Sequence, residues 1–135
     1  MIIDIAEAIT NHFNNSNELN TALTGGLWFQ QAGDDSETPY GVFFFDGSTV
    51  EEIMGDADDV IEQANLQFNL FSNADDGGFE VLSLTKLLVT AFNWQEIDVS
   101  DYKTIKMQKV NIQPIIFIDD YWQITIFFEL HIIKE

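Results

Sequence analysis

The chain has 135 residues, 46% of them hydrophobic, which suits one domain with a buried core and excludes wholesale disorder. Its 23 acids outnumber five lysines, with no arginine, for a net charge of −18, so it lacks the basic surface that grips nucleic acid phosphates or anionic lipid. It has no cysteine, which excludes disulfides, thiolate metal sites and cysteine nucleophiles.

No apolar stretch of the sequence approaches the roughly 20 residues that span a membrane. The first residues also lack the basic start and long apolar run of a signal peptide. We therefore expect the protein to be made in a cytoplasm and not to associate with a membrane. Helical and alternating segments both occur, which predicts a single α+β domain over residues 1–135.

The first part of the chain predicts two helical segments followed by strands. Apolar residues recur at spacings of three and four from Ile2 to Phe13, as on the buried stripe of an amphipathic helix. A second helical turn is stopped by Gly25-Gly26. The predicted elements are a helix over 2–13, a helical turn over 19–23, and strands over 27–29 and 40–45.

The strand over 40–45 contains three consecutive phenylalanines, Phe43, Phe44 and Phe45. Successive side chains of a strand point to opposite faces of the sheet, so this strand carries aromatic rings on both faces. One face can pack beneath the helices. The other needs a cover, either from the chain's own loops or from a partner.

Residues 47–60 contain five acids and no basic residue, and we expect them to form an exposed loop. Asp56, Asp58 and Asp59 resemble the start of a calcium loop, but Val60 occupies the next alternating ligand position and no EF-hand glycine follows. We therefore expect no dedicated metal site and no cofactor. The five acids are Glu51, Glu52, Asp56, Asp58 and Asp59.

The second half of the chain predicts a strand, a helix and a hairpin. The fold expected for the whole chain is therefore a mostly antiparallel sheet, packed with N-terminal and central helices, that ends in a long C-terminal β-hairpin. The expected elements are a strand over 62–70, a helix with its buried stripe at Val81, Leu84, Leu88 and Ala91, and strands over about 104–117 and 121–133 joined by a turn at Asp119-Asp120.

Residues for catalysis are sparse. Neither His12 nor His131 stands beside a serine or aspartate in a hydrolase motif, and the glycine pairs lack the Lys-Ser/Thr of a phosphate loop. Asp119-Asp120 could suggest a pair of glycosidase carboxylates, but turn chemistry explains two aspartates there. The sequence therefore favours a protein that is not an enzyme.

The polar side of the strand over 62–70 is made of uncharged amides, Gln63, Asn65, Gln67 and Asn69, where a solvated strand usually has charged residues. Amides tolerate partial burial more readily than charges do, provided that their hydrogen bonds are met. This face is therefore expected to meet something drier than water. A subunit interface and a layer of the chain's own loops are both compatible with the pattern.

The order of these segments resembles the tail completion, or tail terminator, proteins of long-tailed bacteriophages and prophages. The resemblance covers nearly the whole chain and lies in the succession of motifs, each of which is weak alone. They are "LTGGLWF", "TPYGVFFF", "EQANLQFNLFSN", "FEVLSLTKLLVTAF" and "DDYWQITIFFELHII".

The resemblance implies a structural virion protein at the tail–head junction, assembled in the cytoplasm of a bacterial host. Such subunits form a ring, commonly a hexamer, that caps the tail tube and provides the surface joined by head connector proteins. The implied partners are copies of the chain itself, the tail tube protein and head connectors, without sequence-specific nucleic acid binding. An acidic ring would also suit DNA passage, because like charges repel.

Ring closure requires two different patches on each subunit. The aromatic strand and the mixed face of the last strand suggest one of them, and the acidic loop over 47–60 is the candidate lumen-facing or tube-facing segment. The candidate interface residues are Phe43, Phe44, Phe45, Tyr121 and Phe127.

Two other functions stay open at this point. One is a neighbouring head–tail connector or a tail-tube relative, since these also assemble as rings. The other is a small acidic ligand-binding or enzymatic α+β domain with a cleft between helix and sheet. A polar-lined pocket would favour the latter, and neighbouring tube and connector genes would favour the virion proteins.

Overall fold

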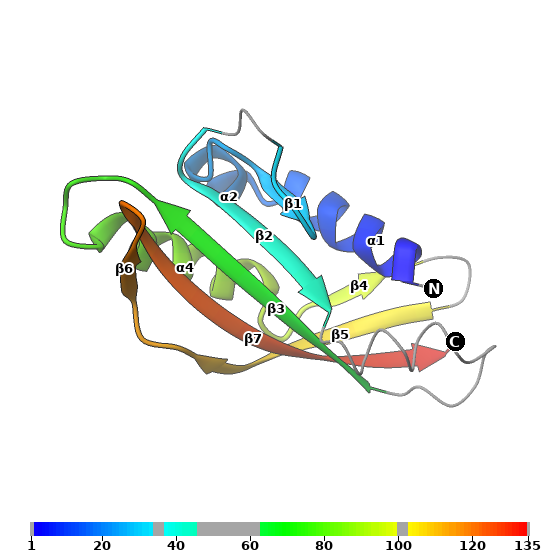
Figure 1. The fold of residues 1–135 in the computed structure, drawn as a ribbon. Coiled ribbons are helices and arrows are strands. Elements are labelled where there is room, and N and C mark those ends of the chain that lie inside the picture. Colours follow the sequence, from blue (N-terminus) through cyan, green and yellow to red (C-terminus); the bar gives the residue numbers. More distant parts are fainter. Residues whose placement is uncertain (1, 34–36, 46–62, 100–102, 135) are drawn as a thin grey trace.

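A computed structural model describes residues 2–33, 37–45, 63–99 and 103–134 (Figure 1). The elements are α1 (Ile2–Asn14), α2 (Asn17–Ala22), β1 (Leu27–Phe29), β2 (Tyr40–Phe45), β3 (Gln63–Ser72), α4 (Phe79–Phe92), β4 (Glu96–Asp98), β5 (Lys103–Ile112), β6 (Ile116–Ile118) and β7 (Tyr121–Lys134).

The strands form one sheet in the order β1-β2-β3-β7-β5-β4, with β6 pairing with β7 beyond the end of β5. Every pairing is antiparallel except that of β1 with β2. Helices α1, α2 and α4 all lie on one side of the sheet, behind it in Figure 1. This arrangement confirms the predicted α+β class and the mostly antiparallel sheet.

The core lies between the helices and the sheet. Residues of α1 and α4 such as Ile5, Ile9 and Leu88 are fully buried against strand residues. Phe68 of β3 lies at the centre, with ring centroids 5.4 Å from Phe128 and 5.3 Å from Phe92 of α4. Aromatic pairs at this separation contribute about 0.5–1.5 kcal/mol beyond the area that they bury, so this cluster fixes the helices on the sheet.

The C-terminal hairpin is present, and its turn lies where the sequence predicts it. Asp119 and Asp120 both have positive φ, 52° and 66°, as a two-residue type I′ turn requires, and aspartate tolerates this conformation. The predicted first strand over 104–117 is wrong in one respect, because it divides into β5 and β6. Pro114 lies in the break, and proline cannot donate a hydrogen bond to the sheet.

The short strand β1 is held beside β2 by close contact between two loops. The Gly25 amide donates a hydrogen bond to the Pro39 carbonyl (2.8 Å), and a Cβ at Gly25 would overlap the carbonyl oxygen of Glu37. Glycine is therefore required here for steric reasons. Trp28 of β1 is tied to the same loop, since its Nε1 donates a hydrogen bond to the Gly25 carbonyl (2.8 Å).

Candidate subunit interface

The three phenylalanines of β2 differ in burial according to the face on which they lie. Phe43 and Phe45 are 0% and 5% exposed and belong to the core, whereas Phe44 is half-buried on the opposite face. Phe43 packs against Phe29 and Phe68, with ring centroids 5.2 and 5.9 Å away. The prediction that Phe43 and Phe45 contact another subunit is therefore wrong, because their rings are already buried within this one.

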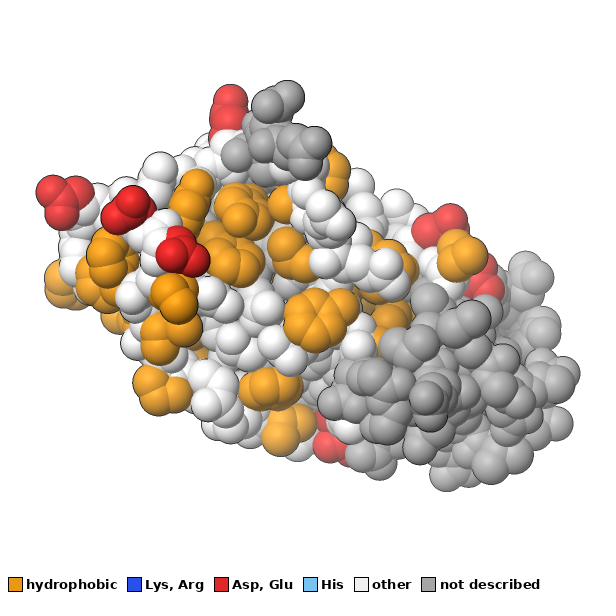
Figure 2. All heavy atoms as spheres, viewed as in Figure 1, with side chains coloured by type: hydrophobic (Ala, Val, Ile, Leu, Met, Phe, Trp, Pro, Cys, Tyr) orange, Lys and Arg blue, Asp and Glu red, His pale blue; other side chains and the backbone are white. Residues whose placement is uncertain are grey.

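The side of the sheet away from the helices is called the open face, and Figure 2 views it directly. Hydrophobic and uncharged polar side chains cover the described part of the sheet in this view, and carboxylates lie towards its periphery. The strand register places its residues in rows across β2, β3 and β7. These rows are Tyr40–Phe71–Gln123, Val42–Asn69–Thr125 and Phe44–Gln67–Phe127.

A small amide network occupies the middle of the open face. The Asn69 side-chain oxygen accepts hydrogen bonds from Gln67 Nε2 (3.1 Å) and from the Thr125 hydroxyl (2.8 Å). These side chains are half-buried and uncharged. Since these side chains are uncharged and two hydrogen bonds already join them, covering this face with another protein surface carries a smaller desolvation cost than covering ionised groups.

Aromatic rings flank the amide network. Tyr40 stacks on Phe71, with centroids 4.9 Å apart and an interplanar angle of 21°. Burial and, second, the nearby Tyr121 raise the pKa of the Tyr40 hydroxyl above its usual 10.0. Phe44 and Phe127 lie on either side of Gln67 in one row. Aromatic residues are enriched in the cores of protein interfaces, from which charged residues are depleted.

The structure thus places three of the five candidate interface residues, Phe44, Tyr121 and Phe127, on the open face. Sequence reasoning missed Tyr40, and it missed Phe71 although a signal was present: Phe71 continues the period-two series of Asn65, Gln67 and Asn69. Trp28, exposed in the three-residue β1, had too short an alternation around it to assign a face.

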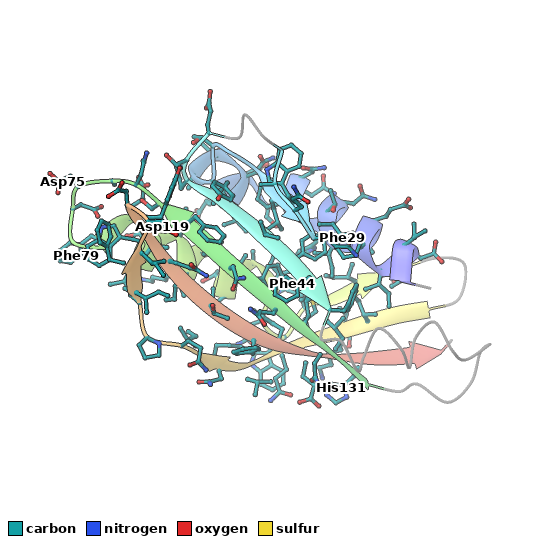
Figure 3. The ribbon with its side chains drawn as sticks, in the orientation of Figure 1. Phe29, Phe44, Asp75, Phe79, Asp119 and His131 are labelled. Atoms are coloured by element: carbon teal, nitrogen blue, oxygen red, sulfur yellow. The ribbon has the colours of Figure 1, made fainter. Side chains whose placement is uncertain are left out.

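Charged groups lie towards the two ends of β7. Asp119 and Asp120 form the turn before it, and Glu129, whose Oε1 lies 3.2 Å from His131 Nε2, is near its other end. Figure 3 shows Asp119 and His131 at these opposite ends, with Phe44 between them along the sheet. Among the described residues, the middle of the open face is therefore uncharged, in a chain whose net charge is −18.

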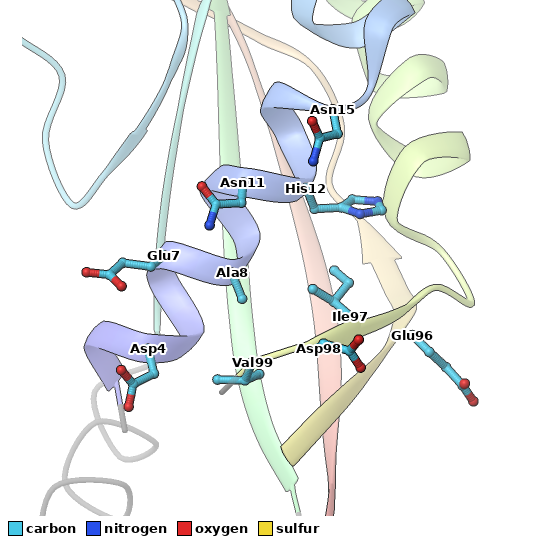
Figure 4. Close-up of a pocket in the computed structure, with 10 residues that line it drawn as sticks. All are labelled: Asp4, Glu7, Ala8, Asn11, His12, Asn15, Glu96, Ile97, Asp98 and Val99. Atoms are coloured by element: carbon cyan, nitrogen blue, oxygen red, sulfur yellow. The ribbon is translucent and has the colours of Figure 1, made fainter. Parts of the chain in front are cut away.

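A pocket of about 330 Å³ between α1 and β4 bears on the enzymatic alternative (Figure 4). Its lining is polar and includes His12 and carboxylates from both elements, Asp4, Glu7, Glu96 and Asp98. His12 is already engaged, since Nε2 lies 2.7 Å from the Ala91 carbonyl and the ring packs on Phe92 at 5.0 Å. This geometry gives His12 a structural role between α1 and α4.

Among the described residues, no three His, Cys, Asp or Glu side chains are grouped closely enough to hold a metal ion. Within the same part of the chain, no helix combines the length and apolar character needed to cross a membrane. The candidate acidic loop, with Glu51, Glu52, Asp56, Asp58 and Asp59, falls outside the described residues.

Comparison with known proteins gives a likeness of fold. No protein-family model matches the chain, and no curated protein matches it. Among solved structures, it is similar to a chain of a structure described as "Virion of native gene transfer agent (GTA) particle". The TM-score is 0.67 at 11% sequence identity, over 94% of this chain and 96% of that one. The likeness therefore concerns the whole fold.

Proposed function

We propose that this chain is a structural subunit of a phage-like virion, a tail terminator that assembles as a ring, caps the tail tube and provides the surface joined by head connector proteins. The observation that carries the proposal is the whole-chain likeness of fold to a chain of a gene transfer agent virion. The order of sequence motifs supports the terminator role within that class of proteins.

The composition of the open face supports a function in assembly. A subunit interface needs shape and apolar contact area, and fully burying one large apolar side chain contributes about 1.5–3 kcal/mol. Phe44, Phe127 and Tyr121 are half-buried, so covering them contributes part of this free energy for each side chain. The amide network keeps its own hydrogen bonds in that event, so the polar centre of the face does not oppose docking.

The acidity of the chain fits the passage of DNA through such a ring. A protein that neutralises phosphates releases counterions and binds tightly, whereas a chain with 23 acids and five lysines repels the polyanion. We assign the acidic segment over 47–60 to the lumen or to the tube-facing side. The role requires no catalysis, so the pocket beside His12 has no part in it.

The function is tested by deleting the gene in the phage or bacterium that encodes the chain and measuring tail lengths by electron microscopy. A terminator stops growth of the tube, so its loss should give tubes of uncontrolled length and heads without tails. Complementation with the wild-type gene should restore one length. Tails of normal length in the deletion strain would contradict the terminator role.

A head–tail connector or a tail-tube protein would also assemble as a ring. The same deletion distinguishes them, since loss of a tube protein removes tails altogether and loss of a connector leaves finished tails of normal length unattached to heads. Only the terminator predicts overlong tubes.

A further inference from the structure

One end of the molecule exposes a cluster of large apolar side chains. Phe79, the first residue of α4, is 72% exposed, and Phe117 of β6 is 57% exposed. The Phe117 ring packs at 4.7 Å from Trp122, and Trp122 lies against Gly78, so β6 and the start of α4 are neighbours. We call the exposed apolar residues at this end the apolar tip. Phe79 and Leu82 of α4 and Phe117 lie on the helix side of the sheet, and Ile116 and Ile118, the register partners of Gln123 and Tyr121, lie on the opposite side of β6.

The apolar tip is surrounded by carboxylates. The segments that form it, residues 73–84 and 115–123, contain five acids and no basic residue. Asp76 accepts hydrogen bonds from the Gly78 and Glu80 amides, and Glu80 accepts one from the Ser72 hydroxyl. Asp75, Asp119 and Asp120 are exposed. Figure 3 shows Asp75, Phe79 and Asp119 together at this end.

The chain's few lysines gather away from the tip. Four of the five are in the hairpin: Lys103 and Lys134 are register partners, and Lys106 and Lys109 follow on β5. Lys106 Nζ lies 5.8 Å from the centroid of the Trp94 ring, and Trp94 is 58% exposed. We call this region the lysine edge; its residues are Trp94, Lys106, Lys109 and Val110.

The lysine edge is held in place by specific contacts. The Asn93 side-chain oxygen accepts a hydrogen bond from the Lys109 amide (2.8 Å), and the Trp94 amide donates to the Met107 carbonyl (2.7 Å). Trp94 keeps a positive φ of 63°, which presents its ring at the surface. Glu96 is the register partner of Lys106, so the edge has mixed charge, in contrast to the purely acidic tip.

The two surfaces cannot meet within one subunit. Ile118 pairs with Tyr121 at the start of β7, and Lys109 and Lys106 pair with Phe128 and His131, further along the same strand. At about 3.3 Å per residue, these separations are about 23 and 33 Å. A contact between them therefore requires two molecules.

We propose that the apolar tip of one subunit docks on the lysine edge of a second copy of the same chain. The charges are complementary, since carboxylates surround the tip and lysines border Trp94 and Val110 on the edge. Two tips facing each other would bring like charges together, which disfavours a symmetric dimer. A contact between two different patches repeats from subunit to subunit and gives either a closed ring or an open filament, and the proposed function selects the ring. The inference rests on the proposed function and specifies its ring contact.

The absence of native cysteine allows a direct test by cross-linking. The variant Ile118→Cys/Val110→Cys places one thiol on the tip and one on the edge, and a short bismaleimide is added to the purified chain. We expect a ladder of covalent oligomers that ends at one size, the closed ring. Ile118→Cys and Val110→Cys alone should give at most traces of dimer. The matched control is Ile3→Cys/Val110→Cys, since Ile3 is even more exposed than Ile118 but lies on α1; it should give no ladder.

Charge reversal tests the chemistry of the same contact. Lys106→Glu/Lys109→Glu in the double-cysteine background should lower the initial rate of ladder formation about tenfold, the effect of losing two ion pairs of ordinary strength. Lys86→Glu, on the exposed side of α4, changes charge outside the lysine edge and should leave the rate within about twofold.

The outcomes separate this inference from the proposed function. Equal ladders from the Ile3 control and the tip–edge pair would overturn the tip–edge contact, as would a lack of effect of Lys106→Glu/Lys109→Glu. If the gene deletion still yields overlong tails, the terminator role stands with a different ring contact. Tails of normal length in the deletion strain together with a specific ladder would leave the tip–edge contact standing and remove its assignment to a terminator.

Discussion

Phe43 and Phe44 are neighbours in sequence and differ in almost every other respect. Phe43 is completely buried among rings of β1 and β3, in the layer between sheet and helices. Phe44 lies on the open face, in a row with Gln67 and Phe127. The core face is almost entirely apolar, whereas the open face surrounds uncharged amides with aromatic rings. The first composition stabilises a fold, and the second is suited to a contact that forms after folding.

The sharpest test of this comparison substitutes each neighbour by the same residue. Phe43→Asp places an unpaired carboxylate in the core, and we expect it to lower the free energy of unfolding by at least about 4 kcal/mol and to abolish the fold. Phe44→Asp leaves its carboxylate in contact with water and should cost less than about 1.5 kcal/mol. Circular dichroism and urea unfolding measure both. Similar losses in the two variants would show that both faces of β2 belong to the core.

A smaller effect is expected in the amide network. Asn69→Ala removes the acceptor that serves both Gln67 and Thr125, and we expect a loss of about 1 kcal/mol in the free energy of unfolding. Asn11→Ala, on the exposed side of α1, is the control and should stay within about 0.5 kcal/mol. If Asn69→Ala lowers the free energy of unfolding no more than the control does, water already satisfies these polar groups. The open face would then be wetter than its hydrogen bonds suggest.

The smallest expected effect is the pH dependence due to Tyr40. Its pKa is higher in the folded chain than in the unfolded one, so the unfolded chain loses the proton first as the pH rises. The stability that this difference contributes is complete below about pH 10 and is lost as the pH rises through the folded pKa. Tyr40→Phe should therefore make stability fall less steeply above about pH 10 in urea unfolding. Identical slopes would contradict the burial of this hydroxyl.

Sequence reasoning predicted most elements of the fold, because α1, α4, β3 and β7 have clear helical or alternating periodicity. It missed β4, whose three residues are too few to establish an alternation. It also joined β5 and β6, since the apolar pattern continues on both sides of the break near Pro114.

The candidate interface was predictable only in part. A run of three phenylalanines has no period, so nothing in it states which ring faces the core. Pairing decides the matter: Phe43 is opposite Phe68 and Phe45 is opposite Leu66, both of which are core residues. The apolar tip depends on β6 meeting the start of α4, a long-range contact that no local pattern contains.

The central claim, that the open face is covered in the assembled particle, is tested most directly by incorporation of Phe127→Asp. The variant is expressed in place of the wild-type chain, purified particles are collected, and the amount of the chain in them is measured by quantitative mass spectrometry. We predict that the isolated variant keeps a wild-type circular dichroism spectrum and is absent from particles. Incorporation at the wild-type level would contradict the claim.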